Sequence, residues 1–259
     1  MKRPKKAVSP AVTMALFLLA VAMLLGSTIG GARAALTYYS ETYTSRIQMY
    51  DIGVTLLENG EAVAWRDYSS AGDGTWNEKD GILLEHMLPE GEELKPGKVY
   101  PEELKVTNTG TINQYVRVSI HKYWMDAQGN KKSDLDPGLI GLKPASLGTD
   151  WIEDEKARTP ERTVLYYNKL LYAEGSGSAV TAPFAESLVI DDAIARKVTE
   201  KAVTEGNRTT ITTTYDYDGV QFRVEAQVDA VQEHNAQDAA WSAWGRRVTI
   251  NNGTLSLRD

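Results

Sequence analysis

The 259-residue chain contains no cysteine and only three histidines. The absence of cysteine excludes disulfides and thiol chemistry, so apolar packing alone must hold the fold together. The histidines, His86, His121 and His234, all lie more than five residues apart, so the chain lacks the His-Glu-x-x-His motif of common zinc peptidases. We therefore expect no enzyme activity, no catalytic residues, no bound metal and no cofactor.

A long apolar run is also missing. The run at residues 14–25 is shorter than the roughly 20 residues that a membrane-spanning helix needs. It follows a basic start and precedes the small residues Ala32 and Ala34, which is the layout of a secretory signal peptide. We expect residues 1–34 to be a signal-peptide helix removed by cleavage beside Ala35, and the protein to be secreted. Contact with a membrane is then expected only through the signal peptide before cleavage.

Positive charge is scarce as well. The chain carries 28 Lys and Arg residues against 35 Asp and Glu residues, a net charge of −7. Without residues 1–34 the balance is 23 basic against 35 acidic residues, a net charge of about −12. Nucleic acids and anionic lipid head groups both require a basic face, so neither is expected as a partner.

What the sequence does contain is a regular alternation of apolar and polar residues, which indicates strands with one buried face. The longest such run extends from Val220 to Ala230. Many short strands separated by turns predict a mainly β fold, an antiparallel β-sandwich of jelly-roll type. Three dipeptides mark expected hairpin turns, namely Asn59-Gly60, Asp218-Gly219 and Asn252-Gly253.

Two segments carry helical signals instead. Asn235 is placed to cap a short helix that ends at Gly245, and residues 191–205 are compatible with a second helix. No linker interrupts residues 48–259, which are expected to form a single domain. Residues 125–165 are the most irregular part of that domain and are expected to be an excursion from the sandwich.

Several groups of side chains admit both a binding and a structural interpretation, and in each case the structural one is favoured. An acidic loop fits a solvated turn better than a calcium site. A set of aromatic residues is expected to pack within the sheets rather than form a carbohydrate-binding stripe. Trp241 and Trp244 are expected to pin the short helix to the sandwich, and Arg117 to pair with an acidic neighbour. The acidic loop comprises Asp126, Asn130, Asp134 and Asp136, and the aromatic set comprises Tyr115, Tyr123, Trp124, Tyr166 and Tyr167.

Four segments, taken together, resemble the TasA/camelysin (CalY-like) family of exported biofilm-matrix proteins. The export segment around Gly30-Gly31-Ala32, with the stretch from Ala35 to Thr42, is similar to substrates of the SipW-type signal peptidase. The other three segments are Pro96-Gly97 followed by 104–110 and 115–118, then 166–171 with Glu174-Gly175, and finally 228–236 ending at Trp244-Gly245.

The resemblance implies a jelly-roll sandwich, export, and assembly into extracellular fibres of a biofilm matrix or cell-surface coat. It further implies donor-strand exchange, in which the freed N-terminal segment of one subunit completes the sheet of its neighbour. In this chain the donor would be residues 35–47, which are rich in Thr and Tyr and contain no Pro or Gly. The implied partners are other copies of the chain or a related exported subunit. The side chains assigned to the candidate donor strand are Leu36, Tyr38, Tyr39, Tyr43 and Ile47.

Two other functions stay open at this point. One is a monomeric cell-surface binding module, such as an adhesin or a carbohydrate binder, and the other, which the histidine pattern disfavours, is an exported metallopeptidase. A matrix subunit should form filaments or large oligomers once the signal peptide is removed. An adhesin should stay monomeric and melt at a higher temperature when its ligand is present.

Overall fold

In the computed structural model the chain divides into two units, residues 1–48 and residues 49–259. Among the described residues, no helix is both long and apolar enough to cross a membrane. The expected signal peptide (apart from Met14), its cleavage site and the candidate donor strand lie outside the described residues. The structure describes Met14 and residues 52–68, 76–84, 87–88, 94–173, 177–205 and 208–258.

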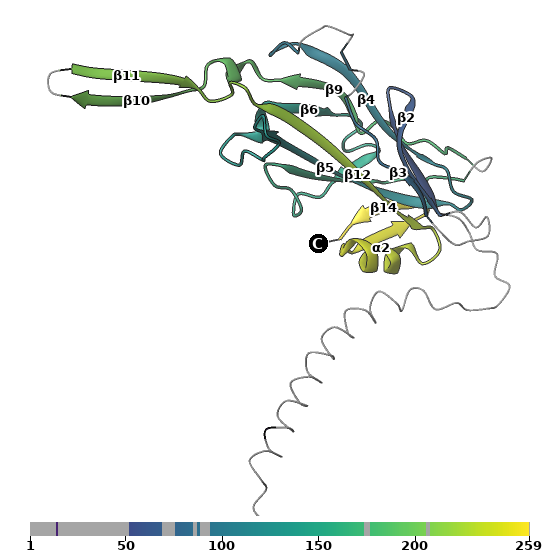
Figure 1. Ribbon diagram of the computed structural model, residues 1–259. Coiled ribbons are helices and arrows are strands. Elements are labelled where there is room, and N and C mark those ends of the chain that lie inside the picture. The colour runs from purple at the N-terminus through teal and green to yellow at the C-terminus, as the bar shows by residue number, and fades with distance from the viewer. Residues whose placement is uncertain are drawn as a thin grey trace, which may run out of the picture. The chain divides into compact units, whose positions relative to one another are not determined.

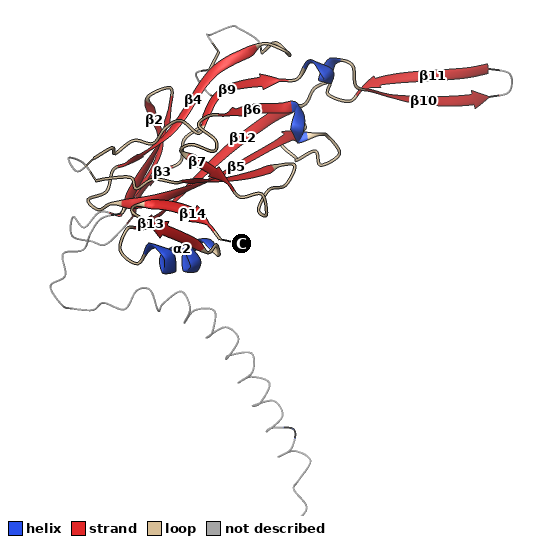
Figure 2. Cartoon of the chain, turned by 180° about the vertical axis from the view of Figure 1, so that it is seen from behind, coloured by secondary structure: helices blue, strands red, loops and turns tan. Residues whose placement is uncertain are grey.

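Two antiparallel sheets form the body of the second unit (Figures 1 and 2). The larger sheet has the strand order β3-β2-β1-β4-β9-β6, and the smaller sheet has the order β12-β5-β8-β7. The expected mainly β, antiparallel sandwich is confirmed, whereas its jelly-roll connectivity stays a prediction. The larger sheet consists of β1 (Gly53–Glu58), β2 (Glu61–Tyr68), β3 (Trp76–Lys79), β4 (Val99–Asn108), β6 (Ile140–Pro144) and β9 (Ala185–Ile190). The smaller sheet consists of β5 (Gln114–Met125), β7 (Trp151–Glu153), β8 (Arg162–Tyr167) and β12 (Gln221–Gln232).

Two of the three expected hairpin turns are confirmed. Asn59-Gly60 joins β1 to β2, and Asn252-Gly253 joins β13 (Val248–Asn251) to β14 (Thr254–Leu257). In both turns the two central residues have positive φ, which Asn and Gly tolerate and which the tightest hairpins require. Asp218-Gly219 is also a turn, but the hairpin expected there is wrong, because β12 pairs with β5 and not with the strand before it.

The helix expected at residues 191–205 is wrong. A short 3-10 helix, η2 (Asp192–Ala195), is followed by β10 (Val198–Glu205), which pairs along its whole length with β11 (Arg208–Tyr215). The β-branched residues of β11 favour extended backbone, and the ladder that they form with β10 outweighs the weak helical preference of residues 198–205.

One α-helix is found among residues 52–258 as described, namely α2 (Ala236–Trp244). It begins after Asn235 and ends at Gly245, as the sequence indicated. Asn235 itself adopts a left-handed conformation and makes no side-chain capping bond, so the expected capping role is wrong. A second 3-10 helix, η1 (Pro137–Leu139), precedes β6.

Residues 125–165 were expected to leave the sandwich, yet they supply strands to both sheets. β6 pairs with β9 in the larger sheet, and β7 pairs with β8 in the smaller one. The reason is apolar burial, because Ile140 and Trp151 from this segment are both fully buried between the sheets.

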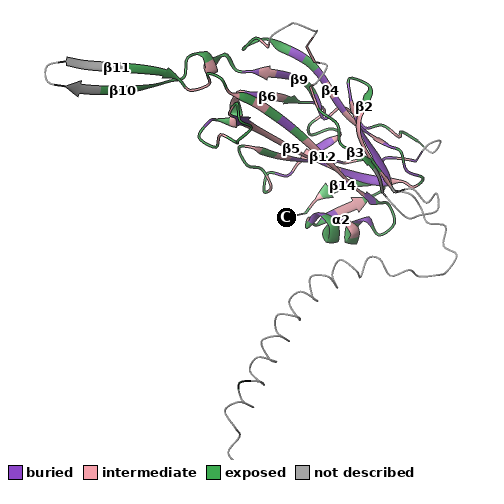
Figure 3. Ribbon diagram, in the orientation of Figure 1, coloured by how far each residue is buried: buried purple, intermediate pink, exposed green. Residues whose placement is uncertain are grey.

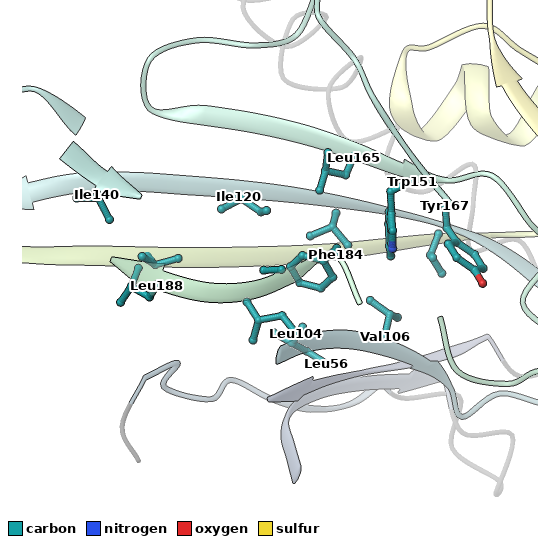
Figure 4. Close-up of a cluster of buried hydrophobic side chains, with 14 of the residues drawn as sticks. Leu56, Leu104, Val106, Ile120, Ile140, Trp151, Leu165, Tyr167, Phe184 and Leu188 are labelled. Carbon is teal, nitrogen blue, oxygen red and sulfur yellow. The ribbon is translucent and has the colours of Figure 1, made fainter. Parts of the chain in front are cut away.

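The main core lies between the two sheets, and Figure 4 shows part of it. Leu56, Leu104 and Val106 from the larger sheet face side chains of the smaller sheet. Trp151 is central, because its ring contacts Tyr167 and Phe184 at centroid distances of 5.1 and 5.6 Å. Leu56, Leu104 and Val106 occupy the inward face of their strands, as the alternation predicted.

A second core lies on the opposite face of the smaller sheet. There α2 and the β13–β14 hairpin cover Tyr115, Val164 and Tyr166. Trp244 packs edge-on against Tyr166 at a centroid distance of 5.5 Å. The outer face of the smaller sheet is therefore covered where α2 and the β13–β14 hairpin lie, whereas Figure 3 shows exposed residues along the described parts of β10 and β11.

Candidate functional site: a groove beside the open edge of β12

β12 forms one edge of the smaller sheet. It pairs with β5 along its whole length, and no strand among the described residues pairs with its other side. At twelve residues it is as long as β5, the longest strand inside that sheet. An open edge of this length presents a row of backbone groups to which another strand can pair.

The hydrogen-bond register shows which backbone groups of β12 face outward. Glu233 N–H donates to the Asn113 carbonyl at 2.9 Å, just beyond the last strand pair, and the register continues without a shift. In an antiparallel ladder, hydrogen-bonded and non-bonded pairs alternate, so the odd-numbered residues of β12 bond to β5. The even-numbered residues, from Phe222 to Ala230, therefore direct their N–H and C=O groups toward the open side.

A groove runs along this open edge, between β12 and the first strands of the larger sheet. One part, of about 700 Å³, is lined by residues 222–226 of β12, by Leu56 and Val63, and by residues 80–84. The next part, of about 360 Å³, continues past residues 226–229 and is lined on its far side by Val54 and Trp65. Residues 222–229 span roughly 27 Å, which is the length of an eight-residue strand.

Both apolar and charged residues line the groove. Val54 and Leu56 are buried at its floor, and Val63, Phe222 and Ala226 are only partly covered. The smaller sheet has four strands against six in the larger one. One more strand beside β12 would cover the partly exposed side chains of Val63, Phe222 and Ala226.

An aromatic cluster lies at the end of the groove that is next to the first residues of β12. Trp124 contacts Tyr217 and Phe222 edge-on, at centroid distances of 4.9 and 6.3 Å. A hollow of about 480 Å³ beside this cluster is also lined by Ile190 and Ile194. Phe222 lines both this hollow and the groove, so apolar surface continues past the end of β12.

Residues 80–84, which we call the wall segment, form one side of the groove. Gly81 lies so close to β2 that a Cβ at this position would be only 1.9 Å from the Val63 carbonyl oxygen. Leu84 has a φ of 67°, a conformation that is rarely adopted by a residue of this size. Its N–H donates to Glu58 Oε1 at 2.5 Å. A hydrogen bond to a buried carboxyl group therefore holds a strained residue in place.

Glu58 lies beside a second buried carboxyl group, that of Glu102. Glu102 shares the inward face of β4 with Tyr100 and Leu104, and it is fully buried there. Burial, a hydrogen bond with Glu58 and the negative charge of Glu58 raise the pKa of Glu102 from 4.5 to about 7. Asn59 opposes this shift weakly through a hydrogen bond of 3.3 Å from Nδ2 to Glu102 Oε2.

The site residues assigned from the sequence lie outside the described residues. These are Ala32, Ala34 and Ala35 at the expected cleavage site, and Leu36, Tyr38, Tyr39, Tyr43 and Ile47 in the candidate donor strand. Conversely, the sequence analysis did not identify the groove or the two glutamates. The alternation of residues 220–230 predicted the strand β12. It could not predict that β12 is an edge strand, because that depends on β12 pairing with β5 alone.

Most of the structural interpretations of other side chains are confirmed. Arg117 pairs with Asp229, with Nη2 and Oδ2 2.6 Å apart. Asp126 Oδ1 accepts the N–H groups of Gln128 and Asn130, as expected of a turn. Four of the five aromatic residues are buried, divided between the two cores, so they form no continuous stripe; the four are Tyr115, Trp124, Tyr166 and Tyr167.

One of these interpretations is wrong. Trp244 does pin α2 to the smaller sheet, but Trp241 is 50% exposed and stacks with Arg247 on the outside. Within the described parts of the chain, no group of three or more His, Asp or Glu side chains is placed to hold a metal ion. His86 lies outside those parts, whereas His121 is on the outer face of the smaller sheet beside Arg162.

Comparison with known proteins adds no assignment, because no protein-family model, no curated protein and no solved structure matches the chain.

Proposed function

We propose that the groove beside β12 accepts an extended segment from another copy of the chain, and that the protein assembles in this way into fibres outside the cell. The open edge of β12, together with the partly covered apolar side chains of Val63, Phe222 and Ala226 in the groove, carries this proposal. The occupant is the segment 35–47 of the neighbouring copy, freed when residues 1–34 are removed. The protein is then a structural component of an extracellular matrix or cell surface and has no catalytic role.

The length of the segment supports the proposal. Residues 35–47 number thirteen, and β12 has twelve residues. The segment contains no proline, so each of its residues can donate a backbone hydrogen bond. Pairing with β12 supplies the affinity, and side chains that alternate into the groove set the register.

The chemistry of the segment also fits the groove. Tyr39, Tyr43 and Ile47 share one face of an extended chain, because side chains two residues apart point the same way. Large side chains on this face match a groove whose own side chains are small near its middle, where Ala226 borders both parts. The resemblance of four segments to the TasA/camelysin family agrees with this interpretation.

A charge placed in the groove is expected to abolish assembly. Ala226 lines both parts of the groove, so Ala226→Glu puts a carboxylate where the donor strand must exclude water. The chain without residues 1–34 should sediment as filaments, and the Ala226→Glu variant should remain monomeric. Thr254→Glu adds the same group at an exposed position of β14, away from the groove lining, so it is the control and should assemble normally in sedimentation and negative-stain imaging.

Removal of residues 35–47 tests the donor rather than the acceptor. The truncated chain should form no filaments by itself but should still cap filaments of the intact chain, because its groove is unaltered. Normal filaments from the truncated chain would contradict the proposal. A processed chain that stays monomeric at every concentration would also contradict it and would favour a monomeric surface-binding module.

A further inference from the structure

We propose that Glu58 and Glu102 share a single proton, and that this proton fixes the wall segment and thereby keeps the groove able to hold a donor strand. Loss of the proton above neutral pH then loosens the wall and weakens assembly. The inference rests on the proposed function, because it concerns the regulation of the same groove.

The first step links Glu58 to the groove. Glu58 ends β1, the strand whose Val54 and Leu56 form the groove floor, and its Oε1 accepts the Leu84 N–H. A left-handed conformation is unfavourable for leucine, and this hydrogen bond helps to hold Leu84 in it, together with a bond from Met87 N–H to the Leu84 carbonyl at 3.3 Å. Displacement of the Glu58 side chain would therefore loosen the wall segment.

The second step places the proton. Glu102 is fully buried, and its Oε1 has no hydrogen-bond partner among the described residues. An ionised carboxylate in this position leaves one oxygen unsatisfied in the interior, which is costly. A protonated carboxyl group instead donates to Glu58, so a single proton satisfies both side chains.

The third step concerns the other charges nearby. Glu58 and Asn59 are the side chains that act on the ionisation of Glu102. Glu103 and Lys105 pair with each other at 2.7 Å on alternate positions of β4. Two further charges of the neighbouring elements, Glu61 opposite Glu58 on β2 and Asp80 in the wall segment, are exposed.

The consequence of losing the proton follows from this arrangement. Two adjacent buried carboxylates repel each other, and the repulsion is relieved when one of them moves to water. Glu58 is next to the Asn59-Gly60 turn at the end of its strand and is the less buried of the two. When the Glu58 side chain moves to water, the Leu84 N–H loses its acceptor and the wall segment loosens. A donor strand then binds more weakly, because binding must first restore the ordered wall segment.

The test compares the critical concentration for filament formation at pH 6 and pH 8, using the chain without residues 1–34. Release of one proton near pH 7 should raise that concentration by up to about tenfold at pH 8. Glu102→Gln keeps a neutral hydrogen-bond donor at every pH, so this variant should assemble equally well at both. Glu103→Gln, at the partly exposed neighbouring position, is the matched control and should retain the pH dependence.

Amide hydrogen exchange of the wall segment supplies a second readout that does not depend on assembly. After correction for the intrinsic pH dependence of exchange, protection of the Leu84 amide should fall at pH 8 in the unaltered chain but not in Glu102→Gln. Equal critical concentrations for the unaltered chain at both pH values, or an unchanged dependence in Glu102→Gln, would overturn this inference and leave the groove function standing. An absence of filaments at both pH values would instead overturn the proposed function itself.

Discussion

Trp151→Ala is expected to lower the free energy of unfolding by about 3–5 kcal/mol, the range found when a large buried aromatic side chain is truncated. Trp151 is fully buried between the sheets, and its Nε1–H donates to the Ala182 carbonyl at 2.9 Å. Its removal leaves a cavity against Tyr167 and Phe184 and also leaves the Ala182 carbonyl without its hydrogen-bond donor. Urea unfolding followed by far-UV circular dichroism measures the change.

Trp241→Ala is the matched control for this prediction. The same side chain is removed, but Trp241 is half exposed and its main described contact is a stacked Arg247 guanidinium, 4.5 Å from the ring centroid. The expected loss is below about 1 kcal/mol. Equal losses in the two variants would contradict the assignment of Trp151 to the centre of the core.

Stability is expected to fall as the pH rises from 4.5 to 7, and Glu102 is the cause. Its pKa of about 7 in the folded chain is above the ordinary value of 4.5, so between these values the folded state binds more protons than the unfolded state. The stability that the neutral carboxyl group contributes is fully present below pH 4.5 and is lost as the pH rises through 7. The total loss is about 3 kcal/mol, since each pKa unit corresponds to about 1.4 kcal/mol.

Glu102→Gln isolates this contribution, because the amide does not titrate. The difference in unfolding free energy between Glu102→Gln and the unaltered chain should be small at pH 4.5 and should grow to about 3 kcal/mol in favour of the variant at pH 8. Other titrating groups cancel in this difference. Stability curves that run parallel from pH 4.5 to pH 8 would show that Glu102 is already ionised at low pH.

Local patterns in the sequence predicted much of the sandwich. The alternation from Val220 to Ala230 gave β12 almost to its ends, and Asn-Gly dipeptides located two hairpins. These features depend on neighbouring residues, so periodicity and turn chemistry are sufficient. The β10–β11 pair was missed because residues 198–205 mix β-branched residues with Glu, Lys and Ala, which favour a helix, and pairing with β11 decides between the two.

Local sequence patterns could not predict the candidate site, and the reason is different. Glu102 is in phase with Leu104 and Val106, so the alternation of β4 places it on the inner face, but a glutamate carries no apolar signal that would mark it as buried. The open edge of β12 depends on which strand occupies each place in the sheet, and β5 precedes it by about a hundred residues. An edge is a property of the assembled sheet, and no single segment encodes it.

The β10–β11 ribbon has a separate consequence for how the molecule is handled by proteases. Its two strands pair only with each other within the described parts of the chain, and a lone two-stranded ribbon is barely stable in water. It will therefore open locally far more often than the two cores unfold. A protease in the surroundings would clip this ribbon before it cut either core, and the trimmed molecule would keep its sandwich, its helix and its acceptor edge.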